Sequence, residues 1–163
     1  AWLSEQAEAI VLMDHPTPEH STTDVVLPVL YHPSVAPDLE WIADDRGLGI
    51  DDVIALHTEA TYFAYATGFA PGFCYLGTLP EALQTPRLDT PRATVPAGAV
   101  AIADAQTAVY PCDSPGGWRL IGACPEPLFN LNNTPPSLLT VGATVRFEPI
   151  SEADFRALGG VMP

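Results

Sequence analysis

Two arginines stand in a proline-constrained segment of the chain, as Pro86-Arg87 and Pro91-Arg92. A guanidinium group keeps its charge at ordinary pH and can hold a carboxylate or a phosphate through two parallel hydrogen bonds. These are two of only six basic residues in a chain with 20 acidic ones, which favours a shared anion site. The alternative is that each arginine pairs with a nearby carboxylate such as Asp89, because surface ion pairs are common and weak.

His57 is a second candidate for chemistry. The apolar positions Ile50, Val53, Ile54 and Leu56 predict a helix that turns His57 toward the body of the domain. An imidazole titrates near neutral pH, so His57 could carry protons as a general acid or base. A histidine on an inward helix face is more often a hydrogen-bonded core residue, and both interpretations stay open.

The stretch from Gly68 to Gly122 joins glycine and proline corners to aromatic side chains. Within it, the turn 114–118 could present successive backbone N–H groups to an anion, with Trp118 beside a planar ligand. A tight hairpin corner with a core tryptophan is the simpler alternative. We expect ligand contacts from Phe69, Pro71, Gly72, Phe73, Tyr75, Pro96, Gly98, Gln106, Tyr110, Ser114, Gly116, Gly117 and Trp118.

The composition excludes several classes of partner. The net charge is −14 and the chain contains no lysine, so nucleic acid and anionic membranes are poor partners. No apolar run approaches the ~20 residues that span a bilayer. Three cysteines without a CxxC motif indicate neither a disulfide framework nor a metal site. We expect a cytoplasmic globular protein.

The elements that must position these residues are mostly short strands. Alternating or β-branched segments predict strands at 25–31, 61–67, 100–102, 118–122 and 141–150, and a further short strand that ends at Val109. Val145 and Phe147 share one face of the last strand. Two short helices are predicted at 37–44 and 51–59, and Gly47 would end the first of them. This pattern favours a mainly β barrel or sandwich. We divide the chain into a helix and linker over 1–24 and a β-domain over 25–163.

Four motifs occur together in a fixed order along the chain. They are Gly68-Phe69-x-Pro71-Gly72-Phe73-x-Tyr75-Leu76, Pro86-Arg87-x-x-x-Pro91-Arg92-x-x-Val95-Pro96-x-Gly98-x-Val100, Gln106-Thr107-x-x-Tyr110-Pro111, and Ser114-Pro115-Gly116-Gly117-Trp118-x-x-Ile121-Gly122. The chain thereby resembles the family called allophanate hydrolase subunit 1, now mostly recognised as the B-type subunit of bacterial 5-oxoprolinase. A sporulation-kinase inhibitor and the carboxyltransferase part of urea amidolyase are similar to it.

The resemblance implies a cyclophilin-like β-barrel with two short helices, preceded by the remnant of a ferredoxin-like α/β domain. It implies a subunit of an ATP-dependent 5-oxoprolinase, using ATP with Mg²⁺ and acting with a second cyclophilin-like subunit and a third catalytic subunit. His57, Arg87 and Arg92 would be the catalytic residues, and the isolated domain would be inactive. The alternatives are a module that inhibits a sensor histidine kinase and a urea amidolyase-type carboxyltransferase component.

Overall fold

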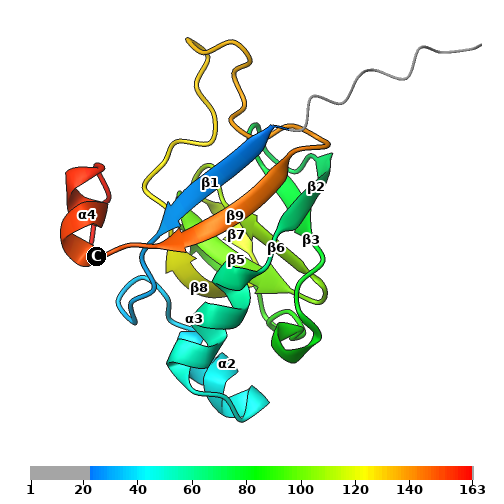
Figure 1. Ribbon diagram of the computed structural model, residues 1–163, viewed down its shortest axis with the longest axis vertical. Helices are drawn as coiled ribbons and strands as arrows, with labels where there is room; N and C mark the ends of the chain where they lie inside the picture. Colours follow the sequence, from blue (N-terminus) through cyan, green and yellow to red (C-terminus); the bar gives the residue numbers. More distant parts are fainter. Residues whose placement is uncertain (1–22, 163) are drawn as a thin grey trace, which may run out of the picture.

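The fold is built around one curved, seven-stranded β-sheet (Figure 1). The computed structural model describes residues 23–162, and the strand order in the sheet is β1-β9-β2-β3-β6-β5-β8. The strands are β1 Asp24–Val29, β2 Tyr62–Thr67, β3 Cys74–Gly77, β5 Ala99–Ala103, β6 Gln106–Val109, β8 Arg119–Ala123 and β9 Thr144–Pro149. Only the β1–β9 pair of this sheet is parallel within the described residues. A bridge between Leu30 and Ala123 joins the two ends, so the sheet is a nearly closed barrel.

Side chains that alternate along the strands fill the barrel. Along β9, Val145 and Phe147 are buried in the main core, whereas Thr144 and Arg146 face the other side. This alternation is the one that the sequence predicts, and the mainly β barrel is confirmed.

Strand β5 is buried on both of its faces. Val100 and Ile102 belong to the barrel core, whereas the three alanines of the strand belong to a second core on the outer surface of the sheet. This outer core also contains Val95, which lies in a separate two-stranded ribbon. The ribbon consists of β4 Arg92–Val95 and β7 Ser114–Gly116. The alanines of β5 and Val95 of the ribbon therefore belong to one apolar core outside the barrel.

The sequence does not predict β3, β4 or β7. Each is only three or four residues long and is bordered or interrupted by glycine or proline. Such a segment has too few residues to show the two-residue alternation by which strands are recognised.

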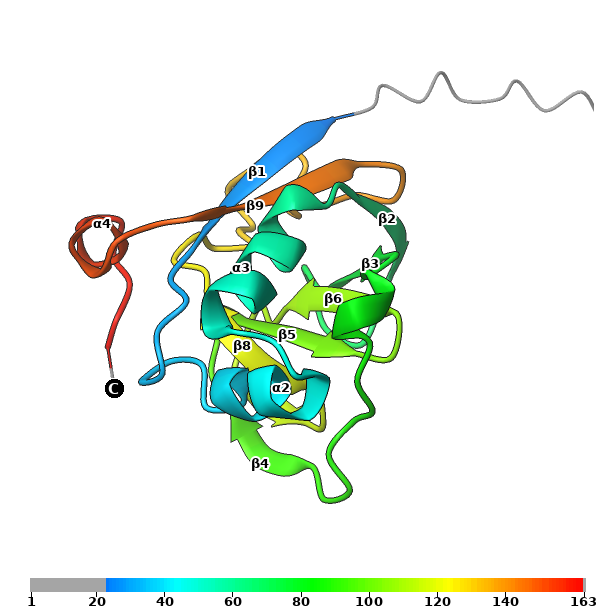
Figure 2. The ribbon, with the colours of Figure 1, turned by 60° about the horizontal axis from the view of Figure 1, so that its bottom comes forward.

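Two predicted helices are confirmed, with bounds shifted by a residue or two. They are α2 Leu39–Arg46 and α3 Ile50–Glu59, and α3 lies between the β1–β9 pair and the β5–β6 pair (Figure 2). Gly47 follows α2 in the left-handed conformation with φ 66°, where a side chain would be strained. A short 3₁₀ helix, η1 Glu81–Leu83, follows β3.

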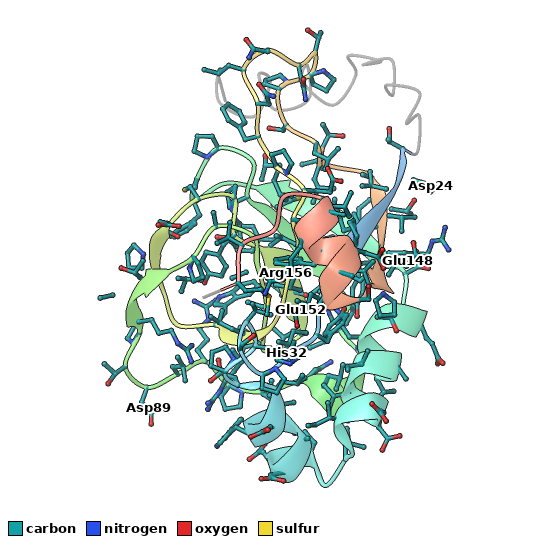
Figure 3. The ribbon with its side chains drawn as sticks, turned by 90° about the vertical axis from the view of Figure 1, so that its left-hand side faces the viewer. Asp24, His32, Asp89, Glu148, Glu152 and Arg156 are labelled. Atoms are coloured by element: carbon teal, nitrogen blue, oxygen red, sulfur yellow. The ribbon has the colours of Figure 1, made fainter. Side chains whose placement is uncertain are left out.

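A further helix, α4 Glu152–Ala157, follows the last strand and is not predicted. It begins after Ser151, whose hydroxyl accepts a hydrogen bond from the backbone N–H of Asp154 at 3.1 Å. Glu152 and Arg156 form an ion pair of 2.8 Å on its exposed side (Figure 3). Phe155 alone among its residues is buried, so the helix is held to the rest of the structure by one apolar side chain.

The helix expected over 1–14, and nearly all of the linker expected over 15–24, lie outside the described residues. The domain division at residue 24 therefore stays a prediction. Among the described residues, none of the helices has the length and apolar character needed to cross a membrane.

Candidate functional site

One small pocket gathers most of the residues that the sequence predicts to bind a ligand. We call it the aromatic pocket. It has a volume of about 120 Å³ and is lined by Phe69, Phe73, Tyr75, Arg87, Tyr110, Pro115, Gly116, Gly117 and Trp118. Every lining residue except Pro115 is a candidate from the sequence analysis. The motifs therefore converge in space as well as following one another along the chain.

Phe73 lies at the centre of the aromatic wall. Its ring centre is 5.2 Å from that of Phe69, 5.0 Å from Tyr75, 5.4 Å from Tyr110 and 6.0 Å from Trp118. All four pairs meet edge to face, an arrangement that contributes about 0.5–1.5 kcal/mol per pair beyond burial. The rings thus hold one another in place before any ligand arrives.

Phe69 is placed over the pocket by a strained turn. The turn is closed by hydrogen bonds from Gly68 N to Phe73 O (3.2 Å) and from Phe73 N to Ala70 O (3.0 Å). Phe69 has φ 71°, a left-handed conformation that bulky residues rarely adopt. Its side chain is nevertheless 61% exposed, so burial of the ring does not explain the strain.

Tyr110 and Gly116 fit together at the inner end of the pocket. A Cβ atom at Gly116 would collide with the Tyr110 hydroxyl, so this corner of the chain requires glycine. Burial raises the pKa of Tyr110, while a backbone hydrogen bond with Trp118 and the positive charge of Arg87 act in the opposite direction. Tyr110 is therefore a neutral hydroxyl near neutral pH.

Arg87 supplies the positive charge of the aromatic pocket. Its guanidinium carbon lies 5.7 Å from the centre of the Trp118 ring. Its Nε is 3.7 Å from a carboxylate oxygen of Asp104, and both side chains are more than half exposed, so this ion pair is weak. Asp89, the carboxylate considered from sequence, lies at the tip of its loop and points into solvent (Figure 3). Arg87 is thus available to an anionic ligand.

Arg92 has a different environment from Arg87. Its Nη2 donates to Oδ1 of Asp38 at 2.8 Å, and its Nη1 donates to the backbone carbonyl of Trp118 at 3.3 Å. Asp38 is buried and also accepts a hydrogen bond from Leu120 N–H at 2.6 Å. An Nη1 atom of Arg119 lies 3.9 Å from the same carboxylate. The charge of Arg92 is therefore largely neutralised by an internal partner, which the sequence analysis does not identify.

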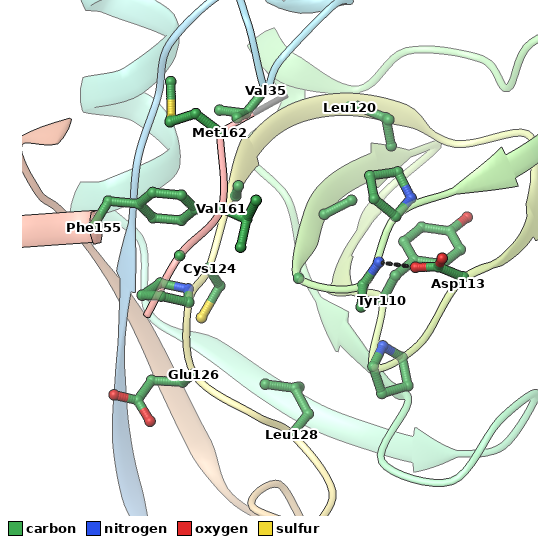
Figure 4. Close-up of a pocket in the computed structure, with 18 of the residues that line it drawn as sticks. Val35, Tyr110, Asp113, Leu120, Cys124, Glu126, Leu128, Phe155, Val161 and Met162 are labelled. Atoms are coloured by element: carbon green, nitrogen blue, oxygen red, sulfur yellow. Dashed lines mark hydrogen bonds between the residues drawn. The ribbon is translucent and has the colours of Figure 1, made fainter. Parts of the chain in front are cut away.

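A larger cavity of about 730 Å³ is also lined by Tyr110 (Figure 4). Arg92, Pro96, Gly98 and Tyr110 are its candidate residues from sequence. Gly98 has φ 82° and its Cα lies against the Cys124 carbonyl, which leaves no room for a side chain. The segment 155–162 forms one wall, and the remaining lining is mostly apolar. The structure therefore divides the candidate residues between two sites.

His57 lies in the barrel core, apart from both cavities. Its Nδ1 is 2.8 Å from the Tyr31 hydroxyl and its Nε2 is 2.9 Å from the Thr107 hydroxyl. Its ring stacks on Phe147 at 4.4 Å between centres. Burial lowers the pKa of His57 to about 3. This environment favours the core interpretation over proton transfer.

The remaining four candidates line neither the aromatic pocket nor the larger cavity. Pro71 is exposed in the turn before β3, and Gly72 packs closely against Phe129. Gln106 pairs with Gly77 at the start of β6. Ser114 lies in β7, and its buried hydroxyl has no hydrogen-bond partner among the described residues.

Comparison with known proteins identifies the family. The sequence matches the family described as "Carboxyltransferase domain, subdomain C and D" over residues 1–139. The chain belongs to this family. The B-type subunit of 5-oxoprolinase from Bacillus subtilis (strain 168) is 46% identical over 133 residues, which is 82% of this chain and 55% of that protein. The same subunit from Haemophilus influenzae is 46% identical over 123 residues, 76% of this chain and 58% of that protein. The resemblance seen in the motifs is confirmed.

Solved structures share the fold of this chain. A conserved uncharacterized protein from Pyrococcus horikoshii is 42% identical, with a TM-score of 0.79 over 94% of this chain and 68% of that one. The urea amidolyase of K. lactis is 18% identical, with a TM-score of 0.68 over 83% of this chain and 10% of that one, and it shows the fold alone. The chain spans little more than half the length of its bacterial 5-oxoprolinase relatives.

Proposed function

We propose that this chain is a component of an ATP-dependent 5-oxoprolinase, which converts 5-oxoproline, ATP and water to glutamate, ADP and phosphate. The observation that carries the proposal is the aromatic pocket, a small ring-lined site with one available guanidinium, in a chain 46% identical to 5-oxoprolinase components. A carboxylate-bearing substrate requires a cation, and Arg87 is the cation that this pocket offers.

In this proposal Arg87 binds an anionic group, and the corner at Gly116 and Gly117 brings backbone close to the ligand. Such preorganised donors stabilise charge that develops during a reaction. Arg92 acts indirectly, because its bonds to Asp38 and to the Trp118 carbonyl hold the pocket's tryptophan segment in place. His57 belongs to the core and carries no proton in this scheme.

The described residues do not fit a site for ATP with Mg²⁺. The aromatic pocket is far too small for a nucleotide, and the larger cavity presents Asp113 and Glu126 beside an arginine that is already paired. We infer that the nucleotide binds on another subunit.

Partner subunits follow from the same reasoning. Phe69, which lines the aromatic pocket, is largely exposed, and the pocket contains no group suited to activating water. We propose that a second cyclophilin-like subunit covers Phe69 and that a third subunit completes the catalytic machinery. The isolated chain is then inactive, since water exclusion and nucleotide binding both require the partners.

The test is an assay of ATP hydrolysis and glutamate formation with the full chain and its two partner subunits. We expect turnover that depends on 5-oxoproline and on the presence of this chain. Arg87→Gln should lower kcat/KM, whereas the matched variant Arg146→Gln, on an exposed position of β9, should leave it unchanged. Absence of 5-oxoproline-dependent turnover with all subunits present would contradict the proposal.

A urea carboxyltransferase component is a second candidate, supported by the description of the matching family and by the fold of K. lactis urea amidolyase. Biotin would then be carried by another chain, since this one contains no lysine to which biotin could be attached. Carboxylation of urea by the same assembly, given a biotinylated carrier, would favour this candidate over 5-oxoprolinase.

A further inference from the structure

We propose that the aromatic pocket binds the substrate itself, as a subsite for a five-membered ring acid of the 5-oxoproline type. The ring would lie against the aromatic wall and its carboxylate would meet Arg87. This inference rests on the proposed function for the identity of the acid. It adds to the proposed function a direct contact between this chain and the substrate ring.

The size of the aromatic pocket limits what can enter it. Its volume is about 120 Å³, against about 730 Å³ for the larger cavity. A small ring can occupy such a space with its carboxylate at the mouth, whereas a nucleotide or a peptide helix cannot. The pocket therefore selects a small cyclic group or the tip of a larger molecule.

The wall of the pocket suits a ring more than an open chain. Phe73 and Trp118 are buried, and their edge-to-face contacts with neighbouring rings leave them little freedom to move. A rigid ligand that enters a preformed pocket loses little conformational entropy. Glutamate, the opened product, has several rotatable bonds to immobilise, so we expect it to bind more weakly than the lactam.

The charge of the pocket indicates an acid. Aromatic walls alone would also favour a cation, but Arg87 already lies over the Trp118 ring and would repel one. Arg87 lacks a strong internal partner, since Asp104 is 3.7 Å away and exposed. A carboxylate at the mouth would compete with Asp104 for this guanidinium. Removing that competitor, as in Asp104→Asn, should strengthen binding of the acid.

The backbone of Phe69 fits a ligand here, and it also fits the partner subunit that the proposed function places over Phe69. A bulky residue at φ 71° costs stability, and its largely exposed ring regains little of that cost by burial. The turn places the Phe69 ring beside Phe73 and Tyr110, at the edge of the pocket. The strain is accounted for if the ring covers a bound ligand.

The test is direct binding of 5-oxoproline to the full chain, without partners, measured by calorimetry and by saturation-transfer NMR. 2-Pyrrolidinone keeps the lactam ring and lacks the carboxylate, and glutamate keeps the carboxylate and lacks the ring. We expect both to bind at least about tenfold more weakly, in line with the loss of a charge-assisted hydrogen bond or of preorganisation. Arg87→Gln should weaken 5-oxoproline binding by a similar factor, and Arg146→Gln should not change it.

The outcomes separate this inference from the proposed function. Equal affinity of wild type and Arg87→Gln for 5-oxoproline would overturn the subsite, as would a failure of 5-oxoproline to bind the chain either alone or with its partner subunits. Unchanged KM for 5-oxoproline in an active assembly that carries Arg87→Gln would also overturn the subsite and leave the proposed function standing. Selective binding by the chain, together with an assembly that does not turn over, would support the subsite and contradict the proposed function.

Discussion

The Tyr31 hydroxyl donates a hydrogen bond to Nδ1 of His57, across 2.8 Å in the barrel core. The direction of this bond follows from the hydrogen bond that Nε2 makes on the other side of the imidazole ring. Thr107 donates its hydroxyl hydrogen to the Ala101 carbonyl at 3.0 Å, so it can only accept from His57 Nε2. His57 is therefore the neutral tautomer with its hydrogen on Nε2, and a second proton on Nδ1 would face the hydroxyl hydrogen of Tyr31.

The first prediction concerns the pH dependence of stability. Burial lowers the pKa of His57 from 6.5 to about 3 in the folded state. Between these two pKa values the unfolded chain binds a proton at His57 and the folded chain does not. The contribution of His57 to the free energy of unfolding is therefore complete above about pH 6.5 and is lost as pH falls toward 3. The free energy of unfolding should fall by up to about 1.4 kcal/mol for each pH unit in this window from this residue alone.

Urea denaturation between pH 7 and pH 4 checks this prediction. Carboxylates also contribute to the slope, so the comparison is between variants. His57→Gln should be less stable at pH 7 and show a flatter pH dependence, whereas His32→Gln, at an exposed position, should keep the wild-type slope. An unchanged slope in His57→Gln would contradict the assignment of a neutral, buried imidazole.

The second prediction concerns the buried carboxylate of Asp38. Asp38→Ala would leave Arg92 without its partner at 2.8 Å and the Leu120 N–H without its acceptor. Removing one member of a buried pair costs about 3–5 kcal/mol, and because Arg92 is partly exposed we expect a value near the lower end. Chemical denaturation measures it, with Asp89→Ala on an exposed loop as the control. A loss of unfolding free energy below about 1 kcal/mol would mean that water takes the place of the Asp38 carboxylate.

The third prediction isolates the strain at Phe69. Phe69→Ala removes the ring and keeps a Cβ at φ 71°, whereas Phe69→Gly removes both the ring and the strain. The glycine variant should be more stable than the alanine variant by about 1 kcal/mol, the reverse of the usual order. Thermal unfolding measures the difference, and both variants should bind 5-oxoproline more weakly. If alanine proves the more stable of the two, then the turn is relaxed in solution and Phe69 carries no strain.

The fourth prediction concerns the contact between Gly116 and Tyr110. Gly116→Ala places a methyl group against the Tyr110 hydroxyl, and overpacking of this kind costs about 1–3 kcal/mol. Tyr110→Phe removes the hydroxyl, so the double variant should recover part of the loss. A double-mutant cycle on unfolding free energies measures the coupling. Additive effects would show that the two residues do not touch.

The aromatic pocket could be predicted from the sequence further than any other part of the molecule. Its residues share short motifs of glycine, proline and aromatic types, and these motifs follow one another in order. The separate environments of Arg87 and Arg92 could not be predicted. Their spacing suggests a common role, but the partner of Arg92 is Asp38, which precedes α2 and reaches it only through the fold. The positive φ angle of Phe69 could not be predicted either, because phenylalanine is not a residue type that indicates a left-handed conformation.

The helices also differ in how far the sequence predicts them. α2 follows from its proline and acidic first turn and from Gly47, and α3 follows from apolar spacing, because local chemistry determines where they begin and end. α4 has six residues and only Phe155 buried, so it leaves no apolar periodicity to detect.

Strand β5 separates two cores. Its larger side chains, Val100 and Ile102, pack in the barrel core, whereas its alanines pack in the outer core. Its outward alanines share a core with Val95 of the ribbon and with Phe73 and Trp118. We expect a larger residue at Ala101 or Ala103 to crowd this core and shift Phe73 or Trp118, which would change the shape of the aromatic pocket without altering any residue that lines it. The specificity of this site can therefore be tuned from the barrel wall, by mutations that a survey of ligand contacts would overlook.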